Sequence, residues 1–364
     1  MALQNVNLTD SDFGFDSVTI VTVLLDGGTY STYVTTTGVL EFADPLAVGG
    51  NYTVVIGPVT AVEGQHTNTA TADGGYGGET YTDNDDANYI GAYGSICGKK
   101  YYDFNRNGWQ DESEVNIAGF KIELYNSTDH LVATGFTDSE GEYCFDYLPL
   151  GDYTVKEVQP NSQWLNTTSP SIEVSLTFSE KISDDNDFGN ICLGYGGGHT
   201  PGYWQNKNGF RTMNDGDTVE PELLLLSTLN LWNEDGTEFD PTTYQEFRTW
   251  LRDSRAVNMA YKLSVSLASM ALNVEAGFVD PNALVYAPDV SGADSLGFIS
   301  ISALIDEANS MLGDGLTLPG DPNRAYQEIL YWALDDANNN MNFLQSSPCP
   351  FSYATTKTRK NNRK

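Results

Sequence analysis

The hydrophobic pattern of this 364-residue chain changes its period once, at the glycine-rich segment 194–198. Before this segment, apolar and polar residues alternate in short runs such as 18–25 and 52–56, separated by GG, DGG and GGY turns. Such alternation between turns is typical of antiparallel β-sandwiches. After the segment, apolar residues recur at helical spacing over 257–274 and over 301–312. We therefore expect several domains, the first β-structured and the last mainly helical.

The same patterns place the domain boundaries. The helix expected over 257–274 is apolar nearly all round, which indicates that it lies buried at the centre of its domain. A last helix is expected from about Pro322, a good first-turn residue, to about Leu344. The predicted domains are a β-sandwich over 1–94, a second β-sandwich over 95–193, a mainly α-helical domain over 194–353 and a basic flexible tail over 354–364.

Acidic residues outnumber basic ones by 50 to 18, which gives a net charge of −32. Five of the 18 basic residues lie in the last eight positions, and residues 1–94 contain 12 acids and no Lys or Arg. A surface of this sign repels phosphate and anionic lipid, so we expect cations as partners and no nucleic acid. No apolar run reaches the ~18 to 20 residues of a transmembrane segment, and the start MALQNVNLTD lacks the features of a secretory signal, so we expect a mature or excised segment.

The four cysteines have no CxxC spacing, which argues against a zinc site or a redox motif. An even number suits two disulfides outside the cytosol. Strand alternation turns Cys97 and Cys144 outward, because their sequence neighbours are expected to face the core, so these two could pair across neighbouring strands. Cys192 and Cys349 would then bracket the helical domain. A pairing of Cys97 with Cys192 stays open, since the first and last strands of the second sandwich could be neighbours.

One segment matches the twelve-residue calcium-loop pattern. Oxygen-bearing side chains stand at its positions 1, 3, 5, 9 and 12, and Gly108 stands at position 6, where the loop turns sharply. The flanking segments KKYY and VNIAGFKIEL have the pattern of strands, so no helix-loop-helix hand is expected. The alternative is an Asn- and Gly-rich turn that binds nothing. The predicted calcium ligands are Asp103, Asn105, Asn107, the carbonyl of Trp109, Asp111 and Glu114.

Three further acidic clusters match calcium chemistry less closely. Such runs are more often solvated turns, but each could complete another calcium site. The DSEGE turn contributes Asp138, Glu140 and Glu142, and the DDNDFG segment contributes Asp184, Asp185 and Asp187. In the first domain, Asp10 and Asp12 are grouped with Asp83, Asp85 and Asp86.

The segment LAVGGNYTVVIGPVTAVEGQHTNTATADGG, residues 46–75, followed by TDNDDANYIGA, resembles the Ig-like repeats of large bacterial and archaeal surface proteins. That family opens with an extra strand ahead of the stretch that LQNVNLTD, residues 3–10, matches here. The resemblance implies a sandwich that begins one strand short, although a truncated sequence would explain the same gap. A missing strand leaves an unpaired sheet edge, and we expect self-association there, with the tail from Phe351 onward as the candidate donor.

Residues 95–192 resemble the SdrD B-like domains, relatives of the collagen-adhesin B modules that form rigid, calcium-loaded stalks. SICGKKYYDFNRNGWQDESEVNIAGFKIELYN, DSEGEYCFDYLPLGDYTVKEV and DNDFGN carry this resemblance, which implies the calcium loop and two framework strands; the cysteines depart from the pattern. Lys99 and Lys100, with Glu157 and Asn190, also resemble the Lys-Glu-Asn set of collagen-adhesin modules that form intramolecular isopeptide bonds. Calcium-type relatives usually lack that bond, so the sequence favours a module without it.

The helical region opens with HTPGYWQNKNGF, residues 199–210, which resembles the TPGYW-type segment of uncharacterised secreted proteins and implies an extracellular location. Tyr203 and Trp204 could stack on a sugar, but core packing is the more common role of such a pair. The three histidines have no metal-ligand spacing, and no nucleophile elbow or phosphate loop is present. We therefore predict no catalytic residue, no cofactor other than Ca²⁺ and no enzymatic activity.

These observations predict two all-β sandwiches, Ig-like or prealbumin-like, followed by a mainly α-helical domain. The predicted function is that of an extracellular, calcium-stabilised structural protein, a subunit of a cell-surface layer, filament or stalk. An adhesin for a glycan or a host protein is the alternative, and an exposed aromatic groove in the helical domain would favour it. A secreted glycoside hydrolase is a second alternative, which would require two facing carboxylates in a cleft of that domain.

Overall fold

Most of the chain is described by the computed structural model, over residues 2–12, 14–15, 20–57, 64–252, 258–313 and 320–353. The expected tail at 354–364 and the residue Val257 lie outside these ranges. The chain divides into two compact units, which are called unit 1 and unit 2 below. Unit 1 comprises residues up to 96 with 146–152 and 175–183, and unit 2 comprises 97–145, 153–174 and 184 onward.

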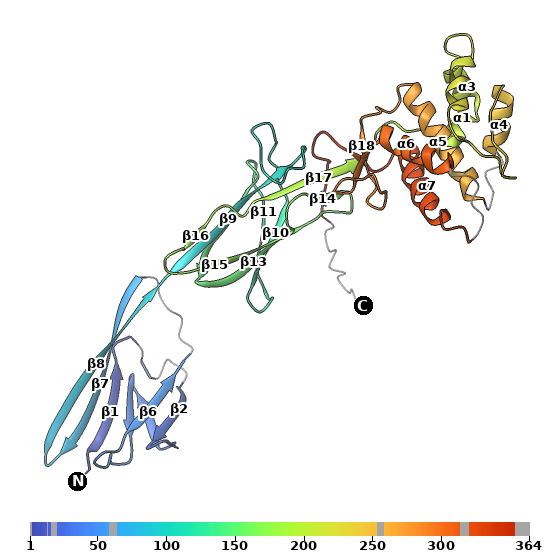
Figure 1. The fold of residues 1–364 in the computed structure, drawn as a ribbon. Helices are drawn as coiled ribbons and strands as arrows, with labels where there is room; N and C mark the ends of the chain where they lie inside the picture. The colour runs from blue at the N-terminus through green and yellow to red at the C-terminus, as the bar shows by residue number, and fades with distance from the viewer. Residues whose placement is uncertain are drawn as a thin grey trace, which may run out of the picture. The chain divides into compact units, whose positions relative to one another are not determined.

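The N-terminal part of unit 1 is the predicted first sandwich (Figure 1). Its sheets have the strand orders β4-β5-β1-β7-β8 and β3-β2-β6. The alternating residues face inward, and Phe42 stacks on Tyr52 with ring centroids 4.0 Å apart. The strands are β1 (Gln4–Asp10), β2 (Ile20–Leu25), β3 (Gly28–Thr29), β4 (Tyr33–Thr36), β5 (Val39–Phe42), β6 (Tyr52–Ile56), β7 (Gly64–Tyr76) and β8 (Glu79–Gly91).

The segment LQNVNLTD forms an internal strand of this sandwich. Its strand β1 pairs with β5 on one side and with β7 on the other. Among the described strands, the sheet edges are instead β4 and β8 in the larger sheet and β3 and β6 in the smaller one. An added strand would have to pair at one of those edges, and self-association stays a prediction.

The second sandwich follows directly. One sheet has the order β11-β10-β13-β15, and the other contains β12-β9-β17, with β14 also pairing with β17 and β16 with β9. The residues predicted to face its core, Phe120, Ile122, Leu124, Tyr153 and Val155, are all buried. The strands are β9 (Tyr93–Tyr102), β10 (Lys121–Asn126), β11 (Leu131–Phe136), β12 (Glu142–Pro149), β13 (Gly151–Val158), β14 (Trp164–Asn166), β15 (Ser171–Leu176), β16 (Ile182–Ser183) and β17 (Phe188–Gly194).

The C-terminal part of unit 2 is mainly helical, as predicted. Helix α5 is buried along nearly all its length and packs against α1, α3, α6 and α7, so it is the expected central helix. The elements are α1 (Pro201–Trp204), α2 (Lys207–Met213), α3 (Glu220–Ser227), α4 (Tyr244–Arg252), α5 (Met259–Glu275), β18 (Leu284–Tyr286), β19 (Phe298–Ser300), α6 (Ile301–Gly313), α7 (Arg324–Asn338) and β20 (Phe343–Leu344).

The last helix is shorter than the sequence predicts. Helix α7 ends at Asn338 rather than near Leu344. Asn340 and Asn342 have φ values of 62° and 67°, a left-handed conformation that Asn tolerates but a helix cannot continue through. The chain then enters β20, which pairs with β17 of the second sandwich.

The glycine-rich segment between the sandwich and the helices is fixed in place. The backbone nitrogens of Gly196 and Gly197 both donate to Oδ1 of Asn340 at 2.7 Å. A Cβ at Gly198 would lie 2.1 Å from the backbone oxygen of Ala337. Close packing therefore requires glycine at Gly198, and the segment is a tightly packed connection.

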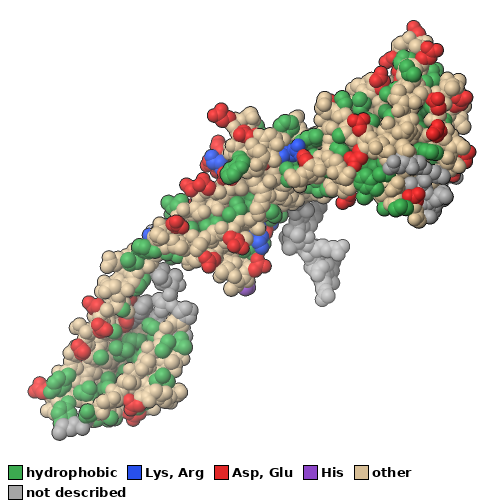
Figure 2. Space-filling view, in the orientation of Figure 1, with side chains coloured by type: hydrophobic (Ala, Val, Ile, Leu, Met, Phe, Trp, Pro, Cys, Tyr) green, Lys and Arg blue, Asp and Glu red, His purple; other side chains and the backbone are tan. Residues whose placement is uncertain are grey.

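Carboxylate side chains are spread over the face shown in Figure 2, whereas its few Lys and Arg side chains lie on the second sandwich. Within the described ranges, no helix combines the length and the apolar character needed to cross a membrane.

Candidate functional site

A lysine lies in the core of the second sandwich. Successive residues of β9 face opposite sides of the sheet, and Lys100 faces inward with none of its surface exposed. Its Nζ lies 3.1 Å from Oε2 of Glu157 and donates to the backbone oxygen of Phe188 at 2.9 Å. The same nitrogen lies 4.8 Å from the centroid of the Phe120 ring. These partners offset the cost of removing an ammonium group from water.

The last strand of the sandwich brings an asparagine to the same place. Strand β17 runs parallel to β9, with Phe188 opposite Lys100 and Asn190 opposite Tyr102. Asn190 is fully buried, and in the described structure neither atom of its side-chain amide makes a well-aligned hydrogen bond. Glu157 enters from β13 in the other sheet, close enough to Asn190 for the amide to affect its pKa. Three elements distant in sequence thus place a Lys, a Glu and an Asn together.

Burial sets the charge state of this cluster. It lowers the pKa of Lys100 to about 8, and the nearby Glu157 carboxylate offsets part of that shift. Burial also raises the pKa of Glu157, against the opposing effects of Lys100 and Asn190. Both shifts favour the neutral forms, a free amine and a protonated carboxyl group. A proton can therefore pass between the two groups more easily than between an exposed Lys and Glu.

The cluster combines three chemical roles. A neutral amine is a nucleophile, a carboxamide carbon is an electrophile, and a carboxyl group with a raised pKa can carry protons between them. The sequence grouped Lys99 and Lys100 together, and the structure distinguishes them. Lys99 points outward, with 46% of its side chain exposed, and pairs with Glu142 at 3.2 Å. Only Lys100 is placed to react.

The predicted calcium ligands form one compact loop between β9 and β10. Asp103 is fully buried, and its two carboxylate oxygens accept hydrogen bonds from the backbone nitrogens of Asn107 at 3.1 Å and Gly108 at 2.9 Å. Gly108 has a φ of 81°, which suits the sharp turn at position 6. The side-chain amides of Asn105 and Asn107 both donate to Oδ2 of Asp111.

Glu114 closes this loop. Its Oε1 accepts from the backbone nitrogen of Asn105 at 3.4 Å, and its Oε2 accepts from that of Asp111 at 3.2 Å. The Trp109 side chain is 77% exposed, which leaves its carbonyl as the expected ligand. The donor set fits calcium, since it consists of carboxylate, amide and carbonyl oxygens. The three carboxylates are not gathered within 4.8 Å of one another in the described structure, and hydrogen bonds between the ligands hold the loop. Calcium binding stays a prediction.

Two of the weaker acidic clusters meet at one hollow of about 480 Å³ on the second sandwich. Asp138 of the DSEGE turn also accepts hydrogen bonds from two backbone nitrogens of its own turn. Glu140 stays exposed, and Asp187 accepts from the backbone nitrogen of Lys99 at 2.7 Å. The hollow is lined by Asp138, Glu142, Asp184, Asp185, Lys99, Gly98, Tyr143, Cys97 and Cys144.

The acidic group of the first domain is spread across its sheet. Asp10 on β1 and Asp85 on β8 both pair with Ala70 of the intervening strand β7. Two strand spacings separate them, about 10 Å. Asp12 lies beyond β1, and its backbone nitrogen donates to Oδ1 of Asp10. Asp83 and Asp86 lie on β8 opposite Ala72 and Thr69.

Both predicted disulfides are present. Cys97 is bonded to Cys144, and Cys192 is bonded to Cys349. The alternative pairing of Cys97 with Cys192 is therefore wrong, although β9 and β17 are neighbours as that alternative required. Cys192 is fully buried. Cys97 lies on the face of β9 opposite to that of the inward-facing Lys100.

The calcium loop makes one contact that the sequence analysis missed. Arg106, at position 4 with a φ of 62°, forms an ion pair with Asp294 of the helical region. Its guanidinium carbon lies 4.8 Å from the centroid of the Phe298 ring. The partners are 188 positions apart, and no local pattern relates them.

The TPGYW-type segment contributes to the core of the helical region. Trp204 is 1% exposed, and Tyr203 stacks on His199 with ring centroids 4.1 Å apart. The backbone nitrogen of His199 donates to Oδ1 of the buried Asn273 at 3.1 Å. The pair Tyr203 and Trp204 therefore packs against the protein, as the more common role predicts.

Residues 94–177 match the SdrD B-like domain family. Serine-aspartate repeat-containing protein D of Staphylococcus aureus (strain Newman) is 32% identical over 98 residues, which cover 24% of this chain and 8% of the relative. Colossin-A of Dictyostelium discoideum is 31% identical over 146 residues, 39% of this chain and 1% of the relative. The major pilin subunit BcpA of Bacillus cereus is 15% identical, with a TM-score of 0.38, over 52% of this chain and 59% of that chain.

The chain thus spans a small part of the length of the first two relatives, 1% of Colossin-A and 8% of the Staphylococcus aureus protein. The family match confirms the SdrD B-like resemblance of the second sandwich. The relatives agree with a protein of the structural or adhesin class that is extracellular or at the cell surface, as predicted. The Ig-like and TPGYW-type resemblances stay predictions.

Proposed function

We propose that this chain is a load-bearing segment of an extracellular structural protein, such as a surface layer, filament or stalk, and that an amide bond between Lys100 and Asn190 locks its second sandwich. The observation that carries this proposal is the buried cluster of Lys100, Glu157 and Asn190. Even with its ion-pair partner, a buried lysine is costly, and hydrophobic residues in place of a buried ion pair are often as stable or more so. Packing of the core does not require a lysine at this position, whereas an amide bond to Asn190 does.

The proposed reaction needs no group beyond these three side chains. Neutral Lys100 attacks Cγ of Asn190 through Nζ, and a new carbon–nitrogen bond forms. Glu157, protonated at the start, delivers its proton to Nδ2 of Asn190 and takes the surplus proton from Nζ. The bond from Cγ to Nδ2 breaks, ammonia leaves, and Glu157 is regenerated. The product is one amide bond between the two side chains, in a core from which water is excluded.

The position of this bond suits a mechanical role. It would connect β9 and β17, the first and last long strands of the second sandwich, which lie side by side and parallel. Tension that pulls these strands in opposite directions would otherwise be resisted by noncovalent contacts such as their backbone hydrogen bonds. A covalent bond between them would hold the sandwich closed at forces that break hydrogen bonds.

Calcium has a supporting role in this proposal. The loop from Asp103 to Glu114 begins three residues after Lys100 and returns the chain to β10. A cation bound by its oxygen ligands would neutralise the carboxylates there and favour the folded state by mass action. The loop would thereby stabilise the strand that carries Lys100.

Intact-mass measurement of the purified chain tests the proposed bond. After reduction of the disulfides, the wild-type mass is expected to be lower than the sequence mass by one ammonia molecule. Lys100→Arg and Asn190→Ala should each have their full sequence mass, and Glu157→Gln should react slowly or not at all. Lys99→Arg is the matched control and should keep the ammonia loss. A folded wild-type chain at its full sequence mass would contradict the proposal.

The alternative functions have less support from the described structure. A hollow of about 580 Å³ in the helical region has Phe239 and Trp250 in its wall, but these rings stack on each other at 4.3 Å and Trp250 is 5% exposed. An exposed aromatic platform for a sugar is therefore not formed there. Hydrogen bonds from Thr237 and Thr242 lower the pKa values of Asp235 and Glu246 in the same wall. A glycosidase acid needs a raised pKa instead.

A further inference from the structure

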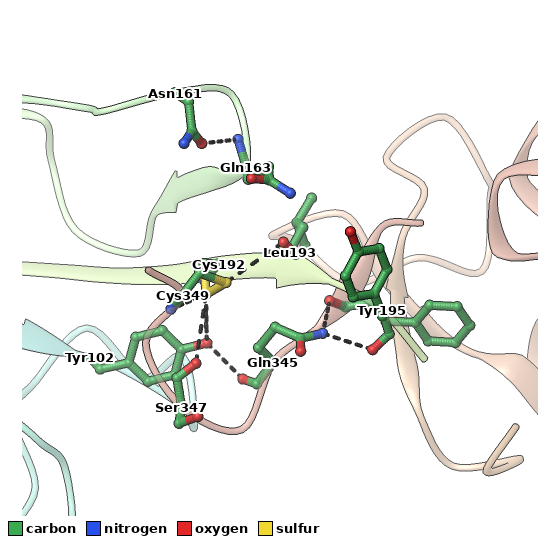
Figure 3. Close-up of a disulfide and its surroundings, with 10 residues drawn as sticks. Tyr102, Asn161, Gln163, Cys192, Leu193, Tyr195, Gln345, Ser347 and Cys349 are labelled. Atoms are coloured by element: carbon green, nitrogen blue, oxygen red, sulfur yellow. Dashed lines mark hydrogen bonds between the residues drawn. A yellow bond between two sulfur atoms is a disulfide. The ribbon is translucent and has the colours of Figure 1, made fainter. Parts of the chain in front are cut away.

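The chain returns to the second sandwich after the helical region. Strand β17 ends at Gly194, and β20 pairs with it in antiparallel orientation, with Phe343 opposite Gly194. The next residue, Gln345, donates through its backbone nitrogen to the backbone oxygen of Cys192 at 3.0 Å. Its own backbone oxygen accepts from the hydroxyl of Tyr102 at 2.6 Å. Figure 3 shows Gln345 between Tyr102 and Tyr195 beside the disulfide.

Residues 345–353, here called the return segment, then pack on the sandwich. The Phe351 ring lies 5.4 Å from that of Phe120 and 5.3 Å from that of Trp164, between ring centroids. The Tyr353 hydroxyl donates to the backbone oxygen of Val158 at 2.7 Å and accepts from the backbone nitrogen of Lys121 at 2.9 Å. The return segment therefore belongs structurally to the sandwich, whereas the sequence placed it in the helical domain.

A disulfide attaches the return segment to β17. Cys349 is bonded to Cys192, which is two residues after Asn190 on the same strand. Residues two apart on a strand face the same side, and both Asn190 and Cys192 are fully buried. One short piece of β17 thus carries both the proposed amide bond and the disulfide.

We propose that the Cys192–Cys349 disulfide is a mechanical clamp that keeps the helical region out of the path of tension along the chain. This inference rests on the proposed load-bearing function and deepens it. Tension entering through β9 would cross from Lys100 to Asn190, follow β17 to Cys192, and cross the disulfide to Cys349. It would leave through the return segment without passing through residues 193–348. The helical region would stay folded at the side of the loaded path.

The noncovalent contacts alone would not give this protection. The two described strand pairs between β17 and β20 are at Leu193 and Gly194. Antiparallel strands pulled apart at one end separate one pair at a time, so these pairs would resist little force. Without the disulfide, tension would detach the return segment, then open β20, and then act directly on the helices. The covalent link is therefore the element that determines the path.

Single-molecule stretching of the full chain tests the clamp, with handles fused at its two ends. The disulfide spans a sequence separation of 157, so breaking it should release a further contour length of about 50 nm. We expect no such event in the oxidised protein and a new event of that length after reduction. The double variant Cys192→Ser with Cys349→Ser should show it without reductant. Equal contour lengths in oxidised and reduced wild-type protein would overturn the clamp.

Two controls separate this outcome from others. Cys97→Ser with Cys144→Ser removes the other disulfide and should leave the redox-dependent event unchanged; its loss would overturn the assignment to Cys192 and Cys349. Failure of the proposed amide bond would have a different signature. It would release about 30 nm, the roughly 90 residues between Lys100 and Asn190, in reduced protein, and about half of that length in oxidised protein, where the Cys97–Cys144 disulfide bypasses residues 98–143. The two proposals can therefore fail separately in the same experiment.

Discussion

The two β-sandwiches of this chain belong to one fold class but are held closed by different means. Residues 1–94 contain no lysine, arginine or cysteine, and the first sandwich depends on packing of its apolar side chains. The second sandwich buries Lys100 with Glu157. One disulfide joins two of its own strands, and another joins β17 to the return segment. Similar sheets can thus be held closed by apolar packing or by packing supplemented with covalent links.

The largest expected difference in stability between the sandwiches comes from the buried cluster of Lys100, Glu157 and Asn190. Asn190→Ala removes the partner of Lys100, and the proposed bond cannot form. Closing a loop of about 90 residues with a covalent link is worth about 4.6 kcal/mol in the chain-entropy model, so the second sandwich should lose roughly that much stability. Scanning calorimetry should show its transition moving down while that of the first sandwich stays in place. A shift of both transitions, or of neither, would contradict the comparison.

Calcium should produce a smaller difference in stability between the two sandwiches. A ligand that binds only the folded state adds about 2.7 kcal/mol at 100 times its Kd, and we expect the effect in the second sandwich. Glu114→Gln removes the position-12 carboxylate and should abolish most of this gain. Glu112→Gln is the matched control, because Glu112 is exposed and outside the ligand pattern. Identical melting curves in calcium and in chelator would show that the loop does not bind the ion.

The pH dependence of the Asn190→Ala variant should reveal the free amine of Lys100. Its pKa is lowered from 10.5 to about 8 in the folded chain, chiefly by burial. Between these values the unfolded chain binds more protons, so the stability of the variant should rise with pH from about 8 to 10.5. The wild-type chain, with this nitrogen in an amide, should lack that rise. Melting temperatures of both proteins at pH 7.5 and 10 give the comparison, and parallel behaviour would count against the bond.

The smallest effect is expected from the neighbouring lysine. Lys99 forms an ion pair with Glu142 at 3.2 Å, with 46% and 55% of the two side chains exposed. Exposed pairs contribute about 0 to 1 kcal/mol, so Lys99→Ala should change the melting temperature little. Chemical denaturation of this variant beside Asn190→Ala would compare loss of the outward-facing Lys99 of β9 with loss of the partner of the inward-facing Lys100. A large loss of stability in Lys99→Ala would contradict the expectation that the exposed face of β9 contributes little to stability.

The sequence predicted those features that depend on local periodicity. The change from alternation to helical spacing identified the sandwiches and the central helix α5, and the facing of β9 predicted the pairing of Cys97 with Cys144. The calcium-loop residues do lie together in one loop. These features depend on residues close in sequence, whose relative positions are fixed by the geometry of one strand or turn.

Features that depend on distant residues were harder to predict. The resemblance to calcium-type relatives favoured a module without the isopeptide bond, and residue types alone could not show that Lys100, Glu157 and Asn190 share a dry core. The return segment was assigned to the helical domain because nothing local relates Phe351 to Phe120. The two prolines beside Cys349 in SSPCPFSY, which prevent a helix there, were the available signal.

The pairing of Gly194 with Phe343 also bears on how such a protein can change during evolution. The residues at which the chain leaves and re-enters the sandwich are adjacent strand partners, about 5 Å apart. Insertions are tolerated best where their two ends lie close together on a completed scaffold. The sandwich, closed by its own return segment, could therefore accept a different insert between these residues. The helical region would then be an exchangeable attachment, acquired or replaced without redesign of the sandwich that carries it.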